Sequence, residues 1–186
     1  MMLKNTFYIF ISILLFSSCQ EININKEVDY TLLLDSLLMH QNELLEEIDS
    51  VKINRCLEKT SERIELFELE HLNDFQKQWL HHEKVAYQKI EKTLGCFNPK
   101  IETLTESLLF SKKQITTLKE DLIHRHLSKD QFNAYLLEEK KALGKLNALS
   151  EKLRTNYNTI LTDFDSLELK LHGIFTQINA LQSEDK

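Results

Sequence analysis

Apolar side chains recur along most of this chain at alternating steps of four and three residues, the spacing of one face of an α-helix. The most regular stripe contains Leu153, Tyr157, Ile160, Phe164, Leu167, Leu171, Ile174, Ile178 and Leu181. An earlier stripe contains Tyr30, Leu34, Leu37, Gln41, Leu44, Ile48 and Val51, and Leu38 and Leu45 widen it. Two more consist of Phe75, Trp79, His82, Ala86, Ile90 and Leu94, and of Ile101, Leu104, Leu108, Ile115, Leu118 and Leu122. This pattern predicts an all-α protein built from long helices.

Two sequence signals predict where the helices turn back. Asn73-Asp74 with Gln76, and Ser128 with Gln131, have the spacing of a capping box, in which side chains bond the free amides at a helix start. These turns divide the chain into three segments of similar length, 27–72, 74–126 and 129–182. We therefore expect an elongated antiparallel bundle of three long helices, coiled-coil-like in its packing.

The middle segment contains a break near Gly95–Pro99. Glycine often follows the last residue of a helix, and Asn98-Pro99 has the residue types favoured at the cap and first position of the next helix. A kink here leaves three long helices, whereas a full reversal gives a four-helix variant. We expect three, because the long last helix needs a neighbour along its whole length.

Composition agrees with long helices and limits the choice of partners. The chain has 186 residues with only three Gly and one Pro, too few for the many turns of a β-sandwich or an α/β fold. Its net charge is −6, and no segment is strongly basic. Nucleic-acid binding depends on neutralising phosphates, so we expect no nucleic-acid partner.

The first residues have the layout of a secretory signal. Lys4 precedes a short apolar run, Thr6 to Phe16, which is too short to cross a bilayer and which ends at Ser17-Ser18-Cys19. This ending resembles the lipobox of bacterial lipoproteins, in the looser form common in Bacteroidota. The resemblance covers residues 1–19 only. It implies that residues 1–18 are removed and that Cys19 carries acyl chains such as palmitate.

The lipoprotein resemblance predicts a domain organisation and a location. Residues 1–18 would be the signal peptide, 19–26 the lipidated cysteine and a tether, and 27–186 the helical bundle domain. The expected location is the bacterial cell envelope, with the outer membrane favoured over the inner membrane. The alternative is a cleaved secretory protein in which Cys19 has no role.

Cys56 and Cys96 are the two other cysteines. Export places them in an oxidising compartment, where paired cysteines usually form disulfides. A turn near Asn73 would bring them to the same level of two antiparallel helices, so we expect a Cys56–Cys96 disulfide. Free or intermolecular thiols are the alternative; a redox pair is disfavoured because no C-x-x-C is present.

Seven histidines raise the question of a metal or haem site. Glu68-x-x-His71 has the spacing of a di-iron ligand pair, but the chain has no second Glu-x-x-His, and Asp121-x-x-His124 is the nearest substitute. His82 lies on the third stripe and is expected at the edge of the bundle. We expect no metal or other cofactor and no catalytic residues, since no nucleophile elbow or Gly-rich loop is present.

The sequence therefore predicts a lipid-anchored, non-enzymatic envelope protein whose helical bundle is a spacer or a protein-binding surface. The expected partners are the membrane, through the lipid, and either another envelope protein or a second copy of the chain. The alternative function is a periplasmic metal- or haem-binding helical bundle.

Overall fold

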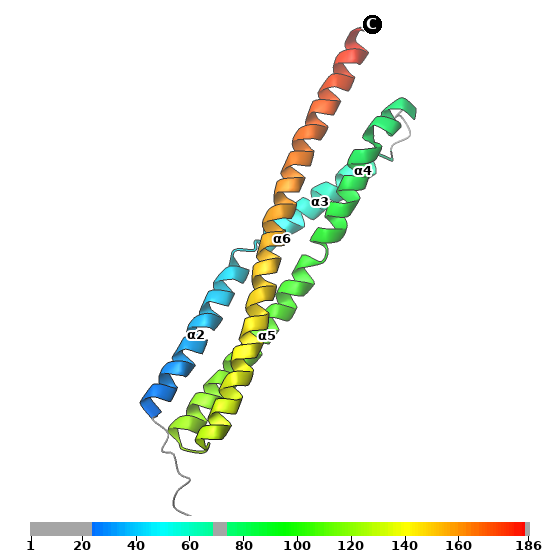
Figure 1. The fold of residues 1–186 in the computed structure, drawn as a ribbon. Coiled ribbons are helices and arrows are strands. Elements are labelled where there is room, and N and C mark those ends of the chain that lie inside the picture. The colour runs from blue at the N-terminus through cyan, green and yellow to red at the C-terminus, as the bar shows by residue number, and fades with distance from the viewer. Residues whose placement is uncertain (1–23, 69–73, 185–186) are drawn as a thin grey trace, which may run out of the picture.

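The computed structural model describes residues 24–68 and 74–184, which form five helices (Figure 1). These are α2 (Ile24–Glu46), α3 (Ser50–Leu66), α4 (Asp74–Leu94), α5 (Phe97–Ile123) and α6 (Lys129–Glu184). No strand occurs among the described residues. The all-α prediction is confirmed.

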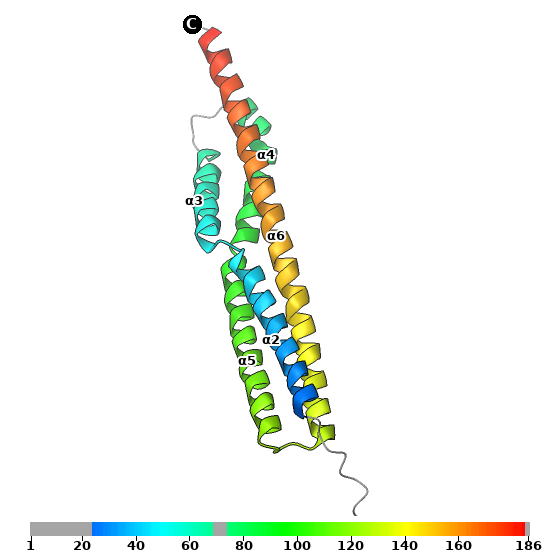
Figure 2. The same cartoon turned by 90° about the vertical axis from the view of Figure 1, so that its left-hand side faces the viewer.

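The helices form an elongated rod in which α6 runs along both halves (Figures 1 and 2). In the lower half, α2 and α5 pack on each other and on the first part of α6. In the upper half, α4 packs on both α3 and the second part of α6. At about 1.5 Å per residue the 56 residues of α6 span about 84 Å. The bundle is therefore three helices thick along its length, and the three-helix expectation is confirmed over the four-helix variant.

The stripes of α5 and α6 are placed as the spacing predicts. On α5 the buried stripe is Leu104, Leu108, Ser111, Ile115, Leu118 and Leu122, with Ser111 filling the one gap in the predicted set. On α6 the buried residues include Leu153, Tyr157, Ile160, Phe164 and Leu171, while Leu167 and Ile174 are half-buried. The side chains of Ile178 and Leu181 lie outside the described part of the chain.

The predicted stripe of α4 is displaced by one residue at His82 and Ala86 and is correct at Ile90 and Leu94. Leu80, Glu83, Tyr87, Ile90 and Leu94 are buried, whereas His82 is exposed and Ala86 is half-buried. The error arises because Glu83, an acidic residue, occupies a core position that an apolar pattern passes over. Phe75 and Trp79 have side chains outside the described set.

The first predicted helix, 27–72, is in fact two. The chain bends at residues 47–49, and the Asp49 carboxylate then caps α3 by accepting hydrogen bonds from the Val51 and Lys52 amides, at 2.8 and 3.0 Å. The bend shifts the buried face, so Ile53 is fully buried while Val51 is 67% exposed. Before the bend, Leu37 of the predicted stripe is exposed, whereas its neighbour Leu38 is buried. Asn73, the predicted cap, lies outside the described residues, and α4 begins at Asp74.

The second break is a kink at Gly95-Cys96 rather than a reversal. The helix begins again at Phe97, not after Asn98 as predicted, and Gly95 does not adopt a positive φ. Pro99 explains the position: it has no N–H to donate to the Gly95 carbonyl, and its ring would crowd that group. Asn98 instead donates a side-chain hydrogen bond to Asn54 of α3, at 3.0 Å. Both breaks therefore lie at one level of the rod, where α6 is unbroken.

The turn before α6 is the one that the capping box predicts. The Ser128 amide donates to Gln131 Oε1 at 2.9 Å, and the Gln131 amide donates to Ser128 Oγ at 3.3 Å. Arg125 in the same turn has a φ of 57°, which reverses the chain direction. This prediction is confirmed in both its position and its hydrogen bonds.

Candidate functional site

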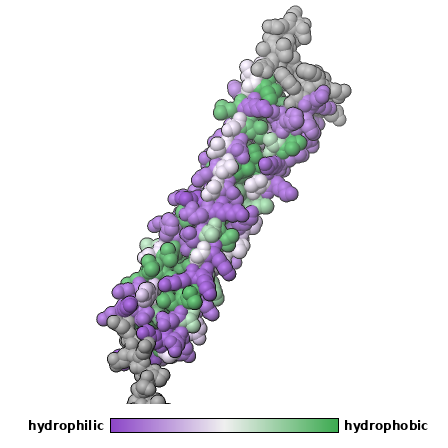
Figure 3. Space-filling model, viewed as in Figure 1, coloured by the Kyte–Doolittle hydropathy of each residue, from purple (hydrophilic) through white to green (hydrophobic). Residues whose placement is uncertain are grey.

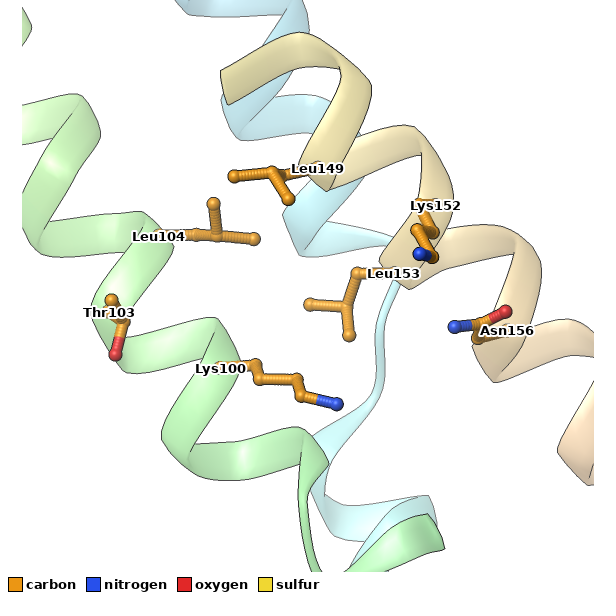
Figure 4. A pocket seen from close by; sticks show the side chains of 7 residues that line it. All are labelled: Lys100, Thr103, Leu104, Leu149, Lys152, Leu153 and Asn156. Atoms are coloured by element: carbon orange, nitrogen blue, oxygen red, sulfur yellow. The ribbon is translucent and has the colours of Figure 1, made fainter. Parts of the chain in front are cut away.

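A pocket of about 320 Å³ lies between α5 and α6 at the level of the two breaks (Figure 4). Its lining residues are Lys100, Thr103, Leu104, Leu149, Lys152, Leu153 and Asn156. Figure 4 shows α2 and the α2–α3 connection behind this pocket, so α2 covers the opposite side of the α5–α6 pair. It is a concave surface site with an apolar floor.

The apolar stripes of α5 and α6 explain the apolar floor of the pocket. Leu104 and Leu153 belong to the buried stripes and form the floor, while Leu149 lies beside the stripe and is 52% exposed. Lys100 and Lys152, one from each helix, are the charged residues of the lining. Leucine side chains with two ammonium groups at the rim can bind an acidic amphipathic surface.

A second pocket of about 300 Å³ continues the same groove towards the upper half. It is lined by Ala86, Lys89, Ile90, Ile160, Asp163, Ser166, Leu167 and Lys170. Leu149, Asn156, Asp163 and Lys170 are spaced by seven residues along α6, so they lie on one side of that helix. The two pockets together define what we call the long groove, which has apolar side chains and lysines in the lining beside both α5 and α4.

A polar cluster joins the three helices of the upper half. The Arg63 guanidinium of α3 donates two hydrogen bonds to the Glu168 carboxylate of α6, from Nε and Nη2 at 3.0 and 2.9 Å. Tyr87 of α4 donates its hydroxyl to Glu168 Oε1 at 2.6 Å. Arg63 holds the pKa of Glu168 below its ordinary value, and the Tyr87 hydrogen bond acts in the same direction. Burial raises the pKa of Tyr87, and the hydrogen bond to Glu168 raises it further.

Tyr87 anchors this cluster in the core, while Arg63 and Glu168 are half-buried. Tyr87 is fully buried, and its ring contacts Phe67 and Phe164 at centroid distances of 5.9 and 6.5 Å. The three polar groups saturate one another, so the cluster is best understood as a connector of α3, α4 and α6. No sequence pattern marks the cluster, because Glu168 and Arg63 are ordinary members of a charged helix surface until the helices are assembled.

A buried carboxylate lies close to the cluster. Glu83 is 3% exposed, and its Oε1 is 2.6 Å from Lys170 Nζ. Lys170 itself is 63% exposed, so the ammonium group lies at the boundary between the core and water. Lys170 lies off the buried stripe of α6, yet its ammonium group pairs with this core acid.

The candidate ligands of a metal or haem are spread along the rod. Glu68 pairs with Lys84 at 2.9 Å, and His71 lies outside the described residues. Asp121 contacts His126 at 3.3 Å rather than the predicted His124. Among residues 24–68 and 74–184, with the masked side chains left aside, no three His, Cys, Asp or Glu residues are grouped to hold a metal ion.

The two cysteines of the bundle lie at one level but are free in the structure. The Asn54–Asn98 and Ser61–Glu91 hydrogen bonds set an antiparallel alignment that places residue 56 level with residue 96. Cys56 is buried and lines a pocket with Phe164 and Asp165, whereas Cys96 is exposed. Burial raises the pKa of the Cys56 thiol, and Asp165 adds to this. The disulfide therefore stays a prediction that requires one thiol to turn towards the other.

The lipobox and Cys19 lie outside the described residues. Within the part of the chain that is described, none of the helices combines the length and the hydrophobicity needed to cross a bilayer. Comparison with family models, with curated proteins and with solved structures found no match to this chain. Function has to be argued from the rod and its groove.

Proposed function

We propose that this chain is a lipid-anchored, non-enzymatic protein of the bacterial cell envelope, in which the rod holds a protein-binding groove away from the membrane. The observation that carries the proposal is the placement of the long groove on a rod with its two ends far apart. The start of α2 lies at the end formed by the α5–α6 turn, and the end of α6 lies at the opposite end (Figure 1).

The anchor would attach to the lower end of the rod. Cys19 precedes Ile24, the first residue of α2, by five residues, which span at most about 18 Å when extended. A lipid on Cys19 would therefore hold the lower half near the membrane and leave the upper half further out. The rod length of about 84 Å for α6 supports the role of a spacer.

The groove supports binding as the second part of the role. Its lower pocket offers three leucines and two lysines, which are the side chains of a recognition surface for a helix with apolar and acidic residues. Helix-in-groove recognition uses an apolar strip of this kind between two helices, with charges at the rim setting partner and orientation.

Metabolic labelling with a fatty-acid analogue tests the anchor. Cys19→Ala is expected to lose the label and to leave the membrane fraction, while the matched control Cys96→Ala, at an exposed thiol, keeps both. Equal labelling of the two variants would contradict the proposal. Crosslinking of the chain in intact envelopes then tests the binding role, since recovery of only uncrosslinked chain would contradict it.

A further inference from the structure

We propose that the outer face of α2 on one copy of the protein occupies the long groove of a second copy, so that parallel rods associate side by side. The outer face of α2 is defined by Leu32, Met39, Glu43 and Glu46. The inference deepens the proposed function, because it names a second copy of this chain as the partner of the groove.

The outer face of α2 carries apolar and acidic side chains, which match the apolar and basic side chains of the groove. Leu32 and Met39 are seven residues apart and are 47% and 65% exposed, so two large apolar side chains point away from the bundle on one side of the helix. Glu43 and Glu46 continue this side four and seven residues after Met39, and both are exposed. No basic residue lies in the last turn of α2. The face is apolar at its centre and acidic towards its C-terminal end.

The lower pocket of the groove is complementary in both respects. Its apolar wall, Leu149, is half-exposed, and its charged lining residues are Lys100 and Lys152. An unshifted α2 helix placed against it would bring the Glu43 and Glu46 carboxylates towards the two ammonium groups at the level of Leu149, and would place Met39 lower, beside Ala142. The pairing of opposite charges beside apolar contacts gives both specificity and orientation.

The levels along the rod agree with this pairing. Gln41 of α2 donates its side-chain amide to the Leu143 carbonyl of α6 at 3.2 Å, and Arg154 of α6 contacts Glu47 at 3.2 Å. Residues 41–47 of α2 therefore lie beside residues 143–154 of α6 in one molecule. Two rods that stand side by side without a vertical shift would place Glu43 and Glu46 close to the level of Lys152.

The two surfaces lie on opposite sides of the α5–α6 pair, because α2 is behind the pocket in Figure 4. Contact between them is heterologous: the surface of one copy meets a different surface of the next. The product is an open row rather than a closed dimer. Anchoring every rod at its lower end would hold the copies parallel and at one height, which is the part of the inference that rests on the proposed function.

Cysteine crosslinking of the full chain, in a Cys96→Ser background, tests the contact. Met39→Cys is combined with Ala142→Cys, which lies seven residues before Leu149 on the groove side of α6 and at the level of Met39. The two positions are on opposite sides of one molecule, so a disulfide has to join two copies. We expect a ladder of dimers, trimers and longer species on oxidation. The control combines Met39→Cys with Leu137→Cys, at an exposed position off the groove side.

Charge reversal provides a second test with a rescue. Glu43→Lys with Glu46→Lys, and separately Lys100→Glu with Lys152→Glu, should each weaken association of the purified full chain in detergent by about tenfold or more. An equimolar mixture of the two variants should associate again, because each then meets an opposite charge on its neighbour. Folding of each variant is checked by circular dichroism, and the rescue separates loss of contact from loss of fold.

Three results would overturn the inference. They are a ladder no longer than that of the control pair, reversed charges that leave association unchanged, and a groove cysteine that captures only a different protein. Absence of the lipid label from chains that retain Cys19, together with an intact ladder in detergent, would contradict the anchor alone. Failure of the lipid anchor and failure of the contact between copies are in this way distinguishable.

Discussion

The two halves of the rod are held together by different chemistry. Of the thirteen exposed large hydrophobic side chains among the described residues, ten lie in the lower half. These are Leu32, Leu33, Leu37, Met39, Leu109, Phe110, Ile123, Tyr135, Leu137 and Leu149. In Figure 3 the largest hydrophobic area on the visible face likewise lies over the lower half. The upper half contains the cross-helix side-chain pairs of Arg63 with Glu168, Lys170 with Glu83, and Ser61 with Glu91. The cross-helix polar contacts between α2 and α6 include the Gln41 hydrogen bond to the Leu143 carbonyl and the Arg154–Glu47 pair near the bend.

This difference between the halves fits the proposed role of the lower half in binding a partner. Apolar packing tolerates repacking and leaves surplus leucine on the surface, which suits a half that meets a partner. Hydrogen-bonded charges fix one arrangement of three helices, and their loss is costly once the groups are buried. We therefore expect stability of the lower half to depend on volume, and stability of the upper half on charge.

The largest effect is expected from a core deletion in the lower half. Leu143→Ala removes a side chain that is 1% exposed and should lower the free energy of unfolding by about 2–5 kcal/mol. Leu137→Ala, on the same helix but 52% exposed, should change it by less than about 0.5 kcal/mol. Urea unfolding followed by circular dichroism measures both. Equal urea midpoints for the two variants would show that packing around Leu143 does not determine the stability of the lower half.

The second-largest effect is expected from removing a charge in the upper half. Glu168→Gln removes the charged acceptor of Arg63 and should cost about 1–3 kcal/mol, since hydrogen bonds to charged groups are stronger than neutral ones. Tyr87→Phe keeps the Arg63–Glu168 pair and should cost only about 1 kcal/mol. Hydrogen exchange should show the Glu168→Gln loss mainly in α3, α4 and the second part of α6. A loss spread evenly over α2 and α5 would remove the distinction between the halves.

The same contrast explains how much of the fold the sequence could predict. α5 and the second part of α6 have apolar residues at nearly every stripe position, so spacing alone located their buried faces. α4 was displaced by one residue because Glu83 is a core acid, neutralised by a lysine 87 positions further along the chain. A local pattern contains no information on a partner so distant.

The breaks and the groove show the same limit. The kink near Pro99 has a local cause and was expected, but the bend at residues 47–49 has no Gly or Pro, and only the capping residue Asp49 marks it. Lys100 and Lys152 are unremarkable on a charged helix surface; their meaning depends on α5 and α6 lying side by side. The Ser128–Gln131 capping box was therefore readable from sequence, whereas the Asp49 cap and the sites formed between helices were not.

The Lys170–Glu83 pair tests the role of charge in the upper half at a single side chain. Lys170→Ala leaves the Glu83 carboxylate buried without its partner and should cost about 1–2 kcal/mol, even though the lysine is mostly exposed. Lys141→Ala, at an exposed position in the lower half, should stay within about 0.5 kcal/mol. The added change Glu83→Gln in the Lys170→Ala chain should recover part of the loss, because the buried charge is gone. No difference between the two lysine variants in thermal melts would show that Glu83 is stable without a counter-charge.

The smallest effect is a dependence on pH that has opposite signs in the two halves. The pKa of Glu168 is lowered in the folded protein, so its contribution is present above its ordinary pKa of 4.5 and is lost as the pH falls below it. The pKa of Glu139 in the lower half is raised by burial and by Glu138, so its ionised form opposes folding, and acid removes that opposition. Lowering the pH from 6 to well below 4.5 should therefore loosen α3 and α4 before α2 and α5, with hydrogen exchange as the measurement. In Glu168→Gln the upper half should lose most of this acid sensitivity, and in Glu139→Gln the lower half should lose its gain. If acid loosens both halves together in the unmodified chain, the polar cluster does not set the stability of the upper half, and the two halves unfold as one unit.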